Sequence, residues 1–510
     1  MKPVIAFYPI GTVHMRNLAL LSKALGEYEF RVLYDRRMPW FAEGATRAYP
    51  YAGMVDEENA PPDKLFEGDV RALVMSIAAI SPMAAALIEE AVDRNIPVIA
   101  IEEVVQLALN QGAINHYLMP VDHLLVASDY ERRAFVKVGI SHEKIQVTGW
   151  PFYSGLDVSP TTERRRLLRS RFDLPEDGVV VTLFLSALKH QRDASTLETP
   201  AIRDKILSIA ADGIPERVNL VIKPHPIEDM EAARNHIQTI CPRARIIAGE
   251  TAVGDVLDVT DVCLNRGNSQ VVIESLLRRI PTLVLPCGLR TLFHGLADEA
   301  IVADPADLTR LIELVLDGGL SDNGRILATH FPWSPEEALH KVADCIREIA
   351  ADRILNMRER DWIDLVLYRG MVGGDEAGRK LITRVVAKGR IAEDLLHSLE
   401  RWLARRASVE DLRRILDNAD APYQRPLALS GWIRQLFENK ERPRSEEMEV
   451  IQLHGPYPPA FNAHDYVRHA TMLSDLYIRM DRLDLAREVL IGMQEQYGML
   501  PSVQTAMART

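Results

Sequence analysis

The chain has 510 residues, which is too long for a single hydrophobic core, so we expect roughly two to four domains. Hydrophobic residues at 47% and charged residues at 26% are typical of a folded globular protein. The net charge of −12 argues against nucleic acid as a bulk partner, because phosphate backbones are bound by lysine and arginine in excess, whereas a nucleotide pocket needs only a few donors.

The first 150 residues alternate apolar runs with segments that have the apolar spacing of helices. The predicted strands are Val4–Tyr8, Phe30–Tyr34, Ala72–Ser76, Pro97–Ile101, His123–Ala127 and Ile145–Thr148. The predicted helices between them are Met15–Leu25, Pro82–Asp93 and Tyr130–Val138. This alternation is typical of a parallel sheet covered by helices, and it predicts a Rossmann-like α/β domain over residues 1–155.

A second set of strands follows an arginine-rich connector, Thr161–Arg171, and predicts another Rossmann-like domain over 156–350. These strands are Val179–Leu185, Val218–Ile222, Ala244–Ile247, Val262–Leu264, Thr282–Leu285 and Ala300–Ala303. Two such domains facing a cleft is the simplest architecture. Ser334, followed by Pro335, predicts the capped start of a helix after the last strand.

Residues 351–510 have few strand-like runs and many amphipathic helices, so we predict an all-α appendage. Tyr466–Tyr497 predicts a helix-turn-helix pair that resembles a tetratricopeptide-type repeat, although a single copy is weak evidence for a solenoid. We expect this region to serve oligomerisation or the binding of a protein partner rather than chemistry.

The segment after the apolar run Val262–Leu264 carries the clearest functional signal. Gly267-Asn268-Ser269 opens a predicted helix and offers backbone N–H groups, a hydroxyl and the positive end of the helix dipole, which suit a phosphate. Glu274 falls in the first turns of that helix, where a carboxylate can hold ribose hydroxyls.

A Pro-His-Pro turn ends an earlier strand of the same domain, and there Lys223 and His225 can add donors to a phosphate. These residues can also have purely structural roles. The turn can simply end the strand, Ser269 can be a helix N-cap, and Glu274 can pair with Arg278 one turn later.

These residues resemble the nucleotide-sugar half of the GT-B glycosyltransferases and their relatives, including the UDP-N-acetylglucosamine 2-epimerases. In that superfamily a Lys/His-Pro turn and a Ser-x-x-x-x-Glu helix start, followed by Pro, face the nucleotide phosphates. Ser269, Glu274 and Pro281 stand at the matching places. The resemblance covers roughly residues 1–350 in layout and is sharp from about 218 to 286. It implies that the helix after Ser334 crosses back to the first domain.

The resemblance also implies roles for three further residues. His14, in the loop after the first strand, is the candidate general base on the acceptor hydroxyl, because imidazole titrates near physiological pH. It can equally cap or pack near the loop. Lys189 and Arg192 lie where the layout brings the donor phosphates and would offset their charge, unless they belong to a solvated loop.

The 2-epimerases provide a discriminator between reactions. Their first domain carries a Gly-Asp-Thr and a His-x-Glu-Ala-Gly, whereas this chain has Met75-Ser76-Ile77 at the first place and retains only Glu102 at the second. A carboxylate without its partner argues against epimerisation, since removal and return of a proton need paired groups.

We therefore predict transfer of a sugar from a nucleotide-activated donor, with UDP or a cytidine nucleotide, to the hydroxyl of a glycan, lipid or protein acceptor, without a metal or another cofactor. The alternatives are a 2-epimerase-like enzyme and a non-catalytic GT-B-fold binding or scaffold protein that works through its helical tail. The four cysteines lack metal-site spacing, and no signal peptide or span-length apolar stretch is evident, so we expect a cytoplasmic protein, with peripheral contact at the inner face of a membrane left open.

Overall fold

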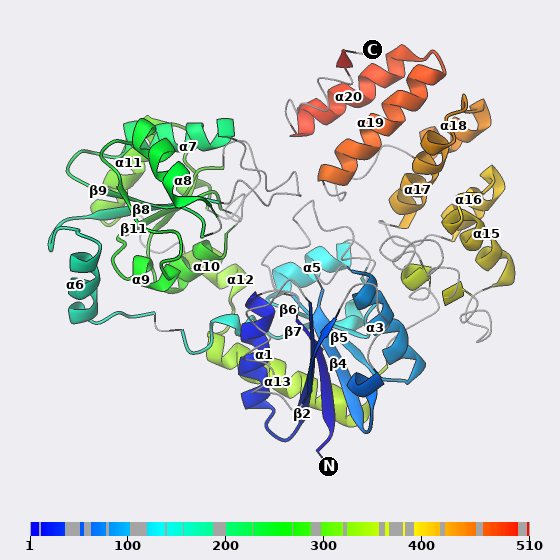
Figure 1. Ribbon diagram of the computed structural model, residues 1–510, viewed down its shortest axis with the longest axis horizontal. Coiled ribbons are helices and arrows are strands. Elements are labelled where there is room, and N and C mark those ends of the chain that lie inside the picture. Colours follow the sequence, from blue (N-terminus) through cyan, green and yellow to red (C-terminus); the bar gives the residue numbers. More distant parts are fainter. Residues whose placement is uncertain are drawn as a thin grey trace. The chain divides into compact units, whose positions relative to one another are not determined.

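Figure 1 shows the computed structural model of the chain. The structure describes residues 2–9, 12–35, 51–55, 63–77, 81–102, 120–137, 140–156, 158–186, 200–226, 228–267, 269–286, 297–319, 324–355, 363–366, 381–382, 392–418, 424–454, 463–497 and 507–508. The chain divides into two compact units, of which the first combines Met1–Ser154 with Trp333–Thr510 and the second is Gly155–Pro332. Both ends of the chain therefore belong to the first unit.

The first unit contains a parallel sheet in the order β3-β2-β1-β4-β5-β6-β7. Its strands are β1 Val4–Tyr8, β2 Glu29–Asp35, β3 Tyr51–Val55, β4 Val70–Ser76, β5 Val98–Ile101, β6 His123–Val126 and β7 Ile145–Val147. Six of them confirm the strands predicted from the apolar runs. The edge strand β3 was not predicted.

Both faces of this sheet are covered, because successive side chains of a strand point to opposite faces. On one face, Ile5 and Phe7 of β1 are buried with Leu18 of α1 (Thr12–Ala24) and Ile346 of α13 (Pro335–Asp352). On the other face, Val4, Ala6 and Tyr8 share a core with α3 (Pro82–Asp93). Helix α5 (Asp129–Lys137) follows β6.

Helix α13 begins with a capping box, in which Ser334 accepts from the amide of Glu337 and the Glu337 carboxylate accepts from the amide of Ser334. The predicted N-cap is thereby confirmed. Since α13 packs against α1 and β4, the chain returns after the second unit to the first sheet, as the resemblance implied.

The second unit contains a parallel sheet in the order β10-β9-β8-β11-β12. Its strands are β8 Val180–Phe184, β9 Asn219–Lys223, β10 Arg245–Ile246, β11 Val262–Asn265 and β12 Thr282–Val284. The predicted strand over 300–303 is wrong: residues 298–300 form a 3-10 turn, and Ile301 makes a single bridge to Val284.

Within the described residues of the second unit, the helices are α6 Thr162–Arg171, α7 Pro200–Gly213, α8 Met230–Ile240, α9 Val253–Leu257, α10 Gln270–Leu277, α11 Pro305–Leu316 and α12 Gly324–His330. The segment predicted as a charged connector is helix α6. Its arginines bind the aspartates around α9, with Arg164 on Asp258 at 2.6 Å and Arg165 on Asp261 at 2.6 Å.

The C-terminal part is helical where the structure describes it. Its helices include α15 Glu393–Leu403, α16 Val409–Asp417, α17 Gln424–Glu438, α18 Ser445–His454, α19 Ala463–Arg479 and α20 Leu483–Tyr497. The predicted helix pair is confirmed as α19 and α20, with Leu473 and Leu476 buried on the first and Ala486 and Leu490 on the second. Two α/β parts and a helical region confirm the predicted fold class.

Among the helices in the described ranges, none is long and apolar enough to cross a membrane.

Candidate nucleotide site

The order of the second sheet creates a topological switch point between β8 and β11. From β8 the chain builds outward through β9 to β10, and it then continues on the other side of β8 with β11 and β12. All pairs are parallel, so every strand ends at the same edge of the sheet. In open α/β sheets, ligands bind outside the carboxyl ends of the strands at such a point.

The loop after β11 is built around Asn265, which is 1% exposed. Its Oδ1 accepts a hydrogen bond from the amide of Gly267 at 2.5 Å, and Gly267 has a φ of +88°, a conformation that favours glycine. The sequence analysis did not name Asn265. Its signal was an Asn two residues before a Gly at the end of an apolar run, the pattern of an Asx turn.

Ser269 is the N-cap of α10, with its Oγ accepting from the amide of Val271 at 3.3 Å. The interpretation of Ser269 as a helix N-cap is therefore confirmed. A hydroxyl that accepts one hydrogen bond still has its own proton to donate, so Ser269 can bind an anion while it caps the helix. Asn268 lies outside the described residues.

Glu274 lies on α10, half-buried, five residues after Ser269. Arg278, at the C-terminal end of the helix, donates to Asp258 at 2.5 Å, and both of these side chains are at most 5% exposed. Arg278 is therefore part of the buried ion-pair network that α6 joins.

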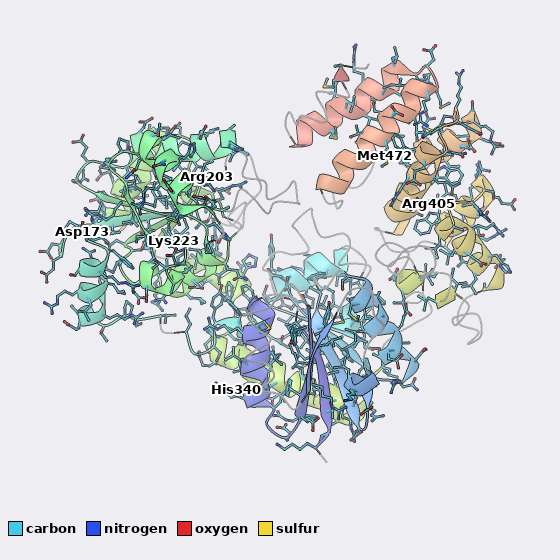
Figure 2. The ribbon with its side chains drawn as sticks, in the orientation of Figure 1. Asp173, Arg203, Lys223, His340, Arg405 and Met472 are labelled. Carbon is cyan, nitrogen blue, oxygen red and sulfur yellow. The ribbon has the colours of Figure 1, made fainter. Side chains whose placement is uncertain are left out.

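Lys223 is the last residue of β9, labelled in Figure 2, and is 4% exposed. Its ammonium donates to the carbonyl oxygen of Gly249 at 2.5 Å, and burial lowers its pKa while Glu250 acts against that shift. Lys223 thus holds the loop that follows β10.

His225 is half-buried in the turn after β9, directly beside that loop. A Cβ atom placed on Gly249 would lie 3.0 Å from the carbonyl oxygen of His225, so a glycine is needed for this close approach. The turn is further fixed by Arg203 of α7, which binds Glu228 through two hydrogen bonds of 2.8 and 3.0 Å and donates to the carbonyl of Ser186 after β8. Arg203 therefore ties the loops after β8 and β9 together.

The structure brings His225 and Ser269 to one edge of the sheet but not to adjacent strands. Strand β8 lies between β9 and β11, which places those two strands about 10 Å apart, twice the usual strand spacing. That distance suits a ligand with more than one phosphate-sized group, or one phosphate approached from both sides. Lys189 and Arg192, which follow β8, lie outside the described residues.

The candidates in the first unit have different surroundings. Glu102 follows β5 and is 2% exposed, and its Oε2 accepts from the amide of Ala127 at 3.1 Å, which links β5 to the end of β6. His14 lies in the first turn of α1, and its side chain is outside the described residues. Arg16, on the same helix, stacks over Phe152, 5.1 Å from the ring centre.

No family model matches the chain, and no curated protein matches its sequence. Among solved structures, the wall teichoic acid polymerase TagF is similar over 69% of this chain and 90% of that one, at 13% identity and a TM-score of 0.45. Anabaena Alr3699/HepE in complex with UDP is similar over 68% of this chain and 100% of that one, at 12% identity and a TM-score of 0.48.

Proposed function

We propose that this protein is a glycosyltransferase that uses a nucleotide-activated sugar. The observation that carries this proposal is the turn from Asn265 to Ser269, which opens helix α10 beside the switch point of the second sheet. A buried amide side chain and a left-handed glycine shape a turn there, next to the positive end of a helix. Such a site suits the phosphates of a nucleotide.

In this proposal, Gly267, Asn268 and Ser269 bind the donor phosphates, and Glu274 binds the ribose hydroxyls. His225, Lys189 and Arg192 would offset the negative charge that develops on the leaving phosphate, which would make a metal unnecessary. The part of Lys223 would be indirect, because its ammonium holds the loop against which His225 packs. The donor nucleotide would be UDP or a cytidine nucleotide.

The acceptor hydroxyl would lose its proton to His14. Glu102, the carboxylate retained at the epimerase position, is a weaker catalytic candidate than His14, because its side chain is buried and already accepts from Ala127. For the same reason a 2-epimerase has less support than a transferase, since its chemistry needs carboxylates that reach the sugar.

A comparison of two helix caps in the second unit tests this proposal. Ser269→Ala removes the cap of α10, and Thr161→Ala removes the cap of α6. In the wild-type protein the hydroxyl of Thr161 accepts from the amide of Arg164 at 3.2 Å. Each change is expected to cost about 1 kcal/mol of stability. Only Ser269→Ala should also weaken nucleotide binding, which a thermal-shift screen with UDP, CDP and CMP derivatives would measure.

A nucleotide at one hundred times its Kd should stabilise the wild-type protein by about 2.7 kcal/mol. The proposal fails if none of these nucleotides shifts the unfolding temperature, or if both cap variants reduce the shift equally. The scaffold alternative makes the opposite prediction for point changes: His225→Ala and Glu274→Ala would leave the cellular role intact, and removal of residues 351–510 would abolish it.

A further inference from the structure

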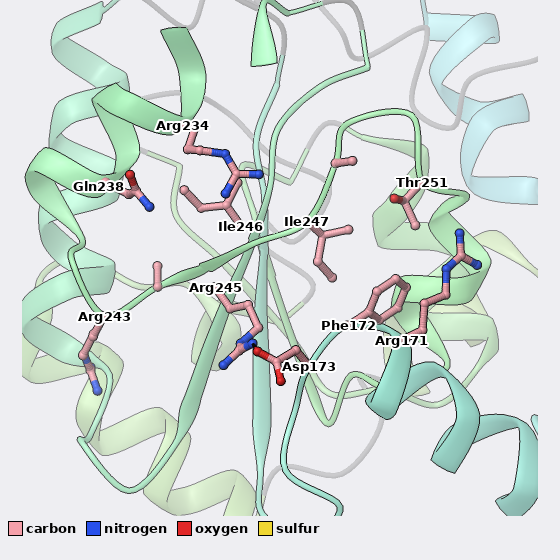
Figure 3. Close-up of a pocket in the computed structure, with 12 residues that line it drawn as sticks. Arg171, Phe172, Asp173, Arg234, Gln238, Arg243, Arg245, Ile246, Ile247 and Thr251 are labelled. Carbon is pink, nitrogen blue, oxygen red and sulfur yellow. Dashed lines mark hydrogen bonds and ion pairs between the residues drawn. The ribbon is translucent and has the colours of Figure 1, made fainter. Parts of the chain in front are cut away.

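A basic groove runs along the outer edge of the second sheet, beside strand β10 (Figure 3). Its volume is about 570 Å³. The end of α6, helix α8 and residues 243–251 contribute its walls. It lies on the same unit as the candidate nucleotide site but two strands away from the switch point.

The groove is strongly positive in a protein whose net charge is −12. Four arginines and one aspartate give its lining a formal charge of +3, the arginines being Arg171, Arg234, Arg243 and Arg245. The single aspartate, Asp173, pairs with Arg245 and is 90% exposed. Positive charge therefore remains, and guanidinium groups favour phosphate and carboxylate oxygens.

The arginines differ in what already binds them. Arg243 donates to the carbonyls of Ile214 and Pro215, and Arg171 lies 3.4 Å from Asp255. Arg234, on α8, has neither an ion pair nor a hydrogen bond within the ranges that the structure describes. It is exposed and can turn to a ligand without breaking a contact.

The shape of the groove indicates an extended ligand. Arg234 and Gln238 lie on one side of β10, and Arg171 and Phe172 lie on the other (Figure 3). A ligand that contacts residues on both sides at once extends past the edge of β10. The amide of Ile247 donates to Ile222 of β9, so the alternation of a parallel strand turns the backbone N–H and C=O of Ile246 outward, where they can bind hydroxyl groups.

One loop joins the groove to the candidate nucleotide site. Ala248 and Thr251 line the groove, while Gly249 between them packs on His225 and accepts from Lys223. We propose that the groove binds the acceptor, a glycan chain that carries phosphate or carboxylate groups along its length. Its role as an acceptor site rests on the proposed function, whereas the binding of such a chain does not.

The test measures binding of the full-length protein to two anionic glycans, a phosphomannan and a polygalacturonate, with neutral dextran as the reference. The variant is Arg234→Ala with Arg245→Ala. The matched control is Arg217→Ala with Arg310→Ala, which removes the same charge from exposed arginines of the same unit outside the groove. Two lost contacts to a chain as densely charged as a single-stranded nucleic acid would lower affinity about 25-fold at 0.1 M salt and reduce the slope of log K against log salt by about 1.4, which sets the upper limit for these glycans.

We expect at least one anionic glycan to bind, the groove variant to lose that binding, and the control to retain it. The difference between the phosphate and carboxylate glycans then tells which oxyanion is preferred. Equal losses in variant and control would overturn the proposal, because net charge alone would explain them. Equally tight binding of a single-stranded oligonucleotide would overturn it too, since the groove would then recognise charge without the glycan.

Two further measurements keep the result interpretable. Arg245 is a residue of the edge strand β10, and a charge there can serve to prevent aggregation. Arg234→Ala alone, a change on α8, therefore repeats the test if the double variant aggregates. The UDP and CDP thermal shifts, measured on the same proteins, separate the two proposals. If nucleotides shift the unfolding temperature but no glycan binds, only the proposal for the groove is contradicted. If a glycan binds but no nucleotide shifts the unfolding temperature, only the proposed function is contradicted.

Discussion

Helices α13 and α6 are attached to their respective units by opposite means. Helix α13 packs on the first sheet through an apolar face, where Val342 and Ile346 are buried with Phe7. Helix α6 is bound to the second unit by ion pairs between its arginines and three aspartates, Asp255, Asp258 and Asp261. Similar helices can therefore be fixed by burial in one unit and by charge in another.

This difference explains which of the two helices the sequence revealed. Helix α13 has an apolar stripe and a capping box, so both its start and its type were predicted correctly. Helix α6 has Leu168 as its one buried apolar residue, beside the buried Arg169, and its arginines gave the pattern of a charged connector. Apolar periodicity cannot detect a helix whose inward face is charged.

Replacement of Asp258 should have the largest effect on stability. Asp258→Ala removes the acceptor of both Arg164 and Arg278, and Arg278 is 5% exposed, so a buried charge loses its partner at an expected cost of about 3–5 kcal/mol. Asp255→Ala provides the control, because Asp255 is 23% exposed and its pairs with Arg164 and Arg171 are nearer the surface. Its loss should cost less than about 1 kcal/mol.

The tryptophans allow the two units to be followed separately. All six lie in the first unit, at positions Trp40, Trp150, Trp333, Trp362, Trp402 and Trp432. Asp258→Ala should therefore lower the unfolding midpoint seen by far-UV circular dichroism and leave the tryptophan fluorescence transition in place. A shift of the fluorescence transition by the same amount would mean that the ion-pair network does not act locally.

Gly149, which packs against the start of α13, tests the apolar attachment. A Cβ atom at Gly149 would lie 2.6 Å from the Cβ of Ala338, and the φ of Gly149 is +82°. Gly155 has a similar φ of +71° but nothing within 4 Å of such an atom. Both alanine variants should lose about 1–2 kcal/mol to the backbone conformation, and Gly149→Ala should lose about 1–3 kcal/mol more to overpacking.

Tryptophan fluorescence should detect the Gly149→Ala effect, because Trp333 lies 3.2 Å from the same added atom. If the two glycine variants had equal stability, the contact between the turn and α13 would be loose, and the apolar attachment would be weaker than its burial indicates.

The strands were largely predictable because parallel strands are buried on both faces and read as continuous apolar runs. Strand β3, Tyr51–Val55, escaped because it is a short edge strand with a glycine in its centre. The last predicted strand was wrong because a short apolar run at 300–303 packs beside β12 with a single bridge. An apolar run indicates that a segment is buried, but a buried segment need not form the repeated backbone hydrogen bonds of a strand.

The candidate site was only partly predictable. The sequence indicated that Ser269 opens a helix and that His225 ends a strand, but strand order decides how far apart such residues lie, and β8 separates them. The supporting contacts were not predictable at all. Arg203 joins the loops after β8 and β9 across long sequence separations, and no local pattern marks it as buried.

The smallest predicted effect concerns the C-terminal end of α13, where burial and polarity combine. His123 of β6 is 1% exposed, and its Nε2 lies 2.9 Å from the carbonyl oxygen of Ile354, just after the helix. A carbonyl can only accept, so Nε2 has the proton and Nδ1 accepts from Gln146. Gln146 in turn accepts from the thiol of Cys345 on α13.

This chain of contacts requires a neutral imidazole. Burial lowers the pKa of His123 below 6.5. The hydrogen bond to Ile354 and the nearby Asp122 oppose this shift, whereas Lys144 adds to it. Between the pKa of His123 in the folded protein and its pKa in the unfolded chain, the unfolded chain binds more protons. The contribution of His123 to the free energy of unfolding should therefore be fully present above about pH 6.5 and decrease as the pH falls below that value. His123→Gln removes the titrating group and should flatten this part of the fluorescence-detected stability profile. A slope that survives in His123→Gln would assign the pH dependence to another group and leave α13 attached by its apolar face alone.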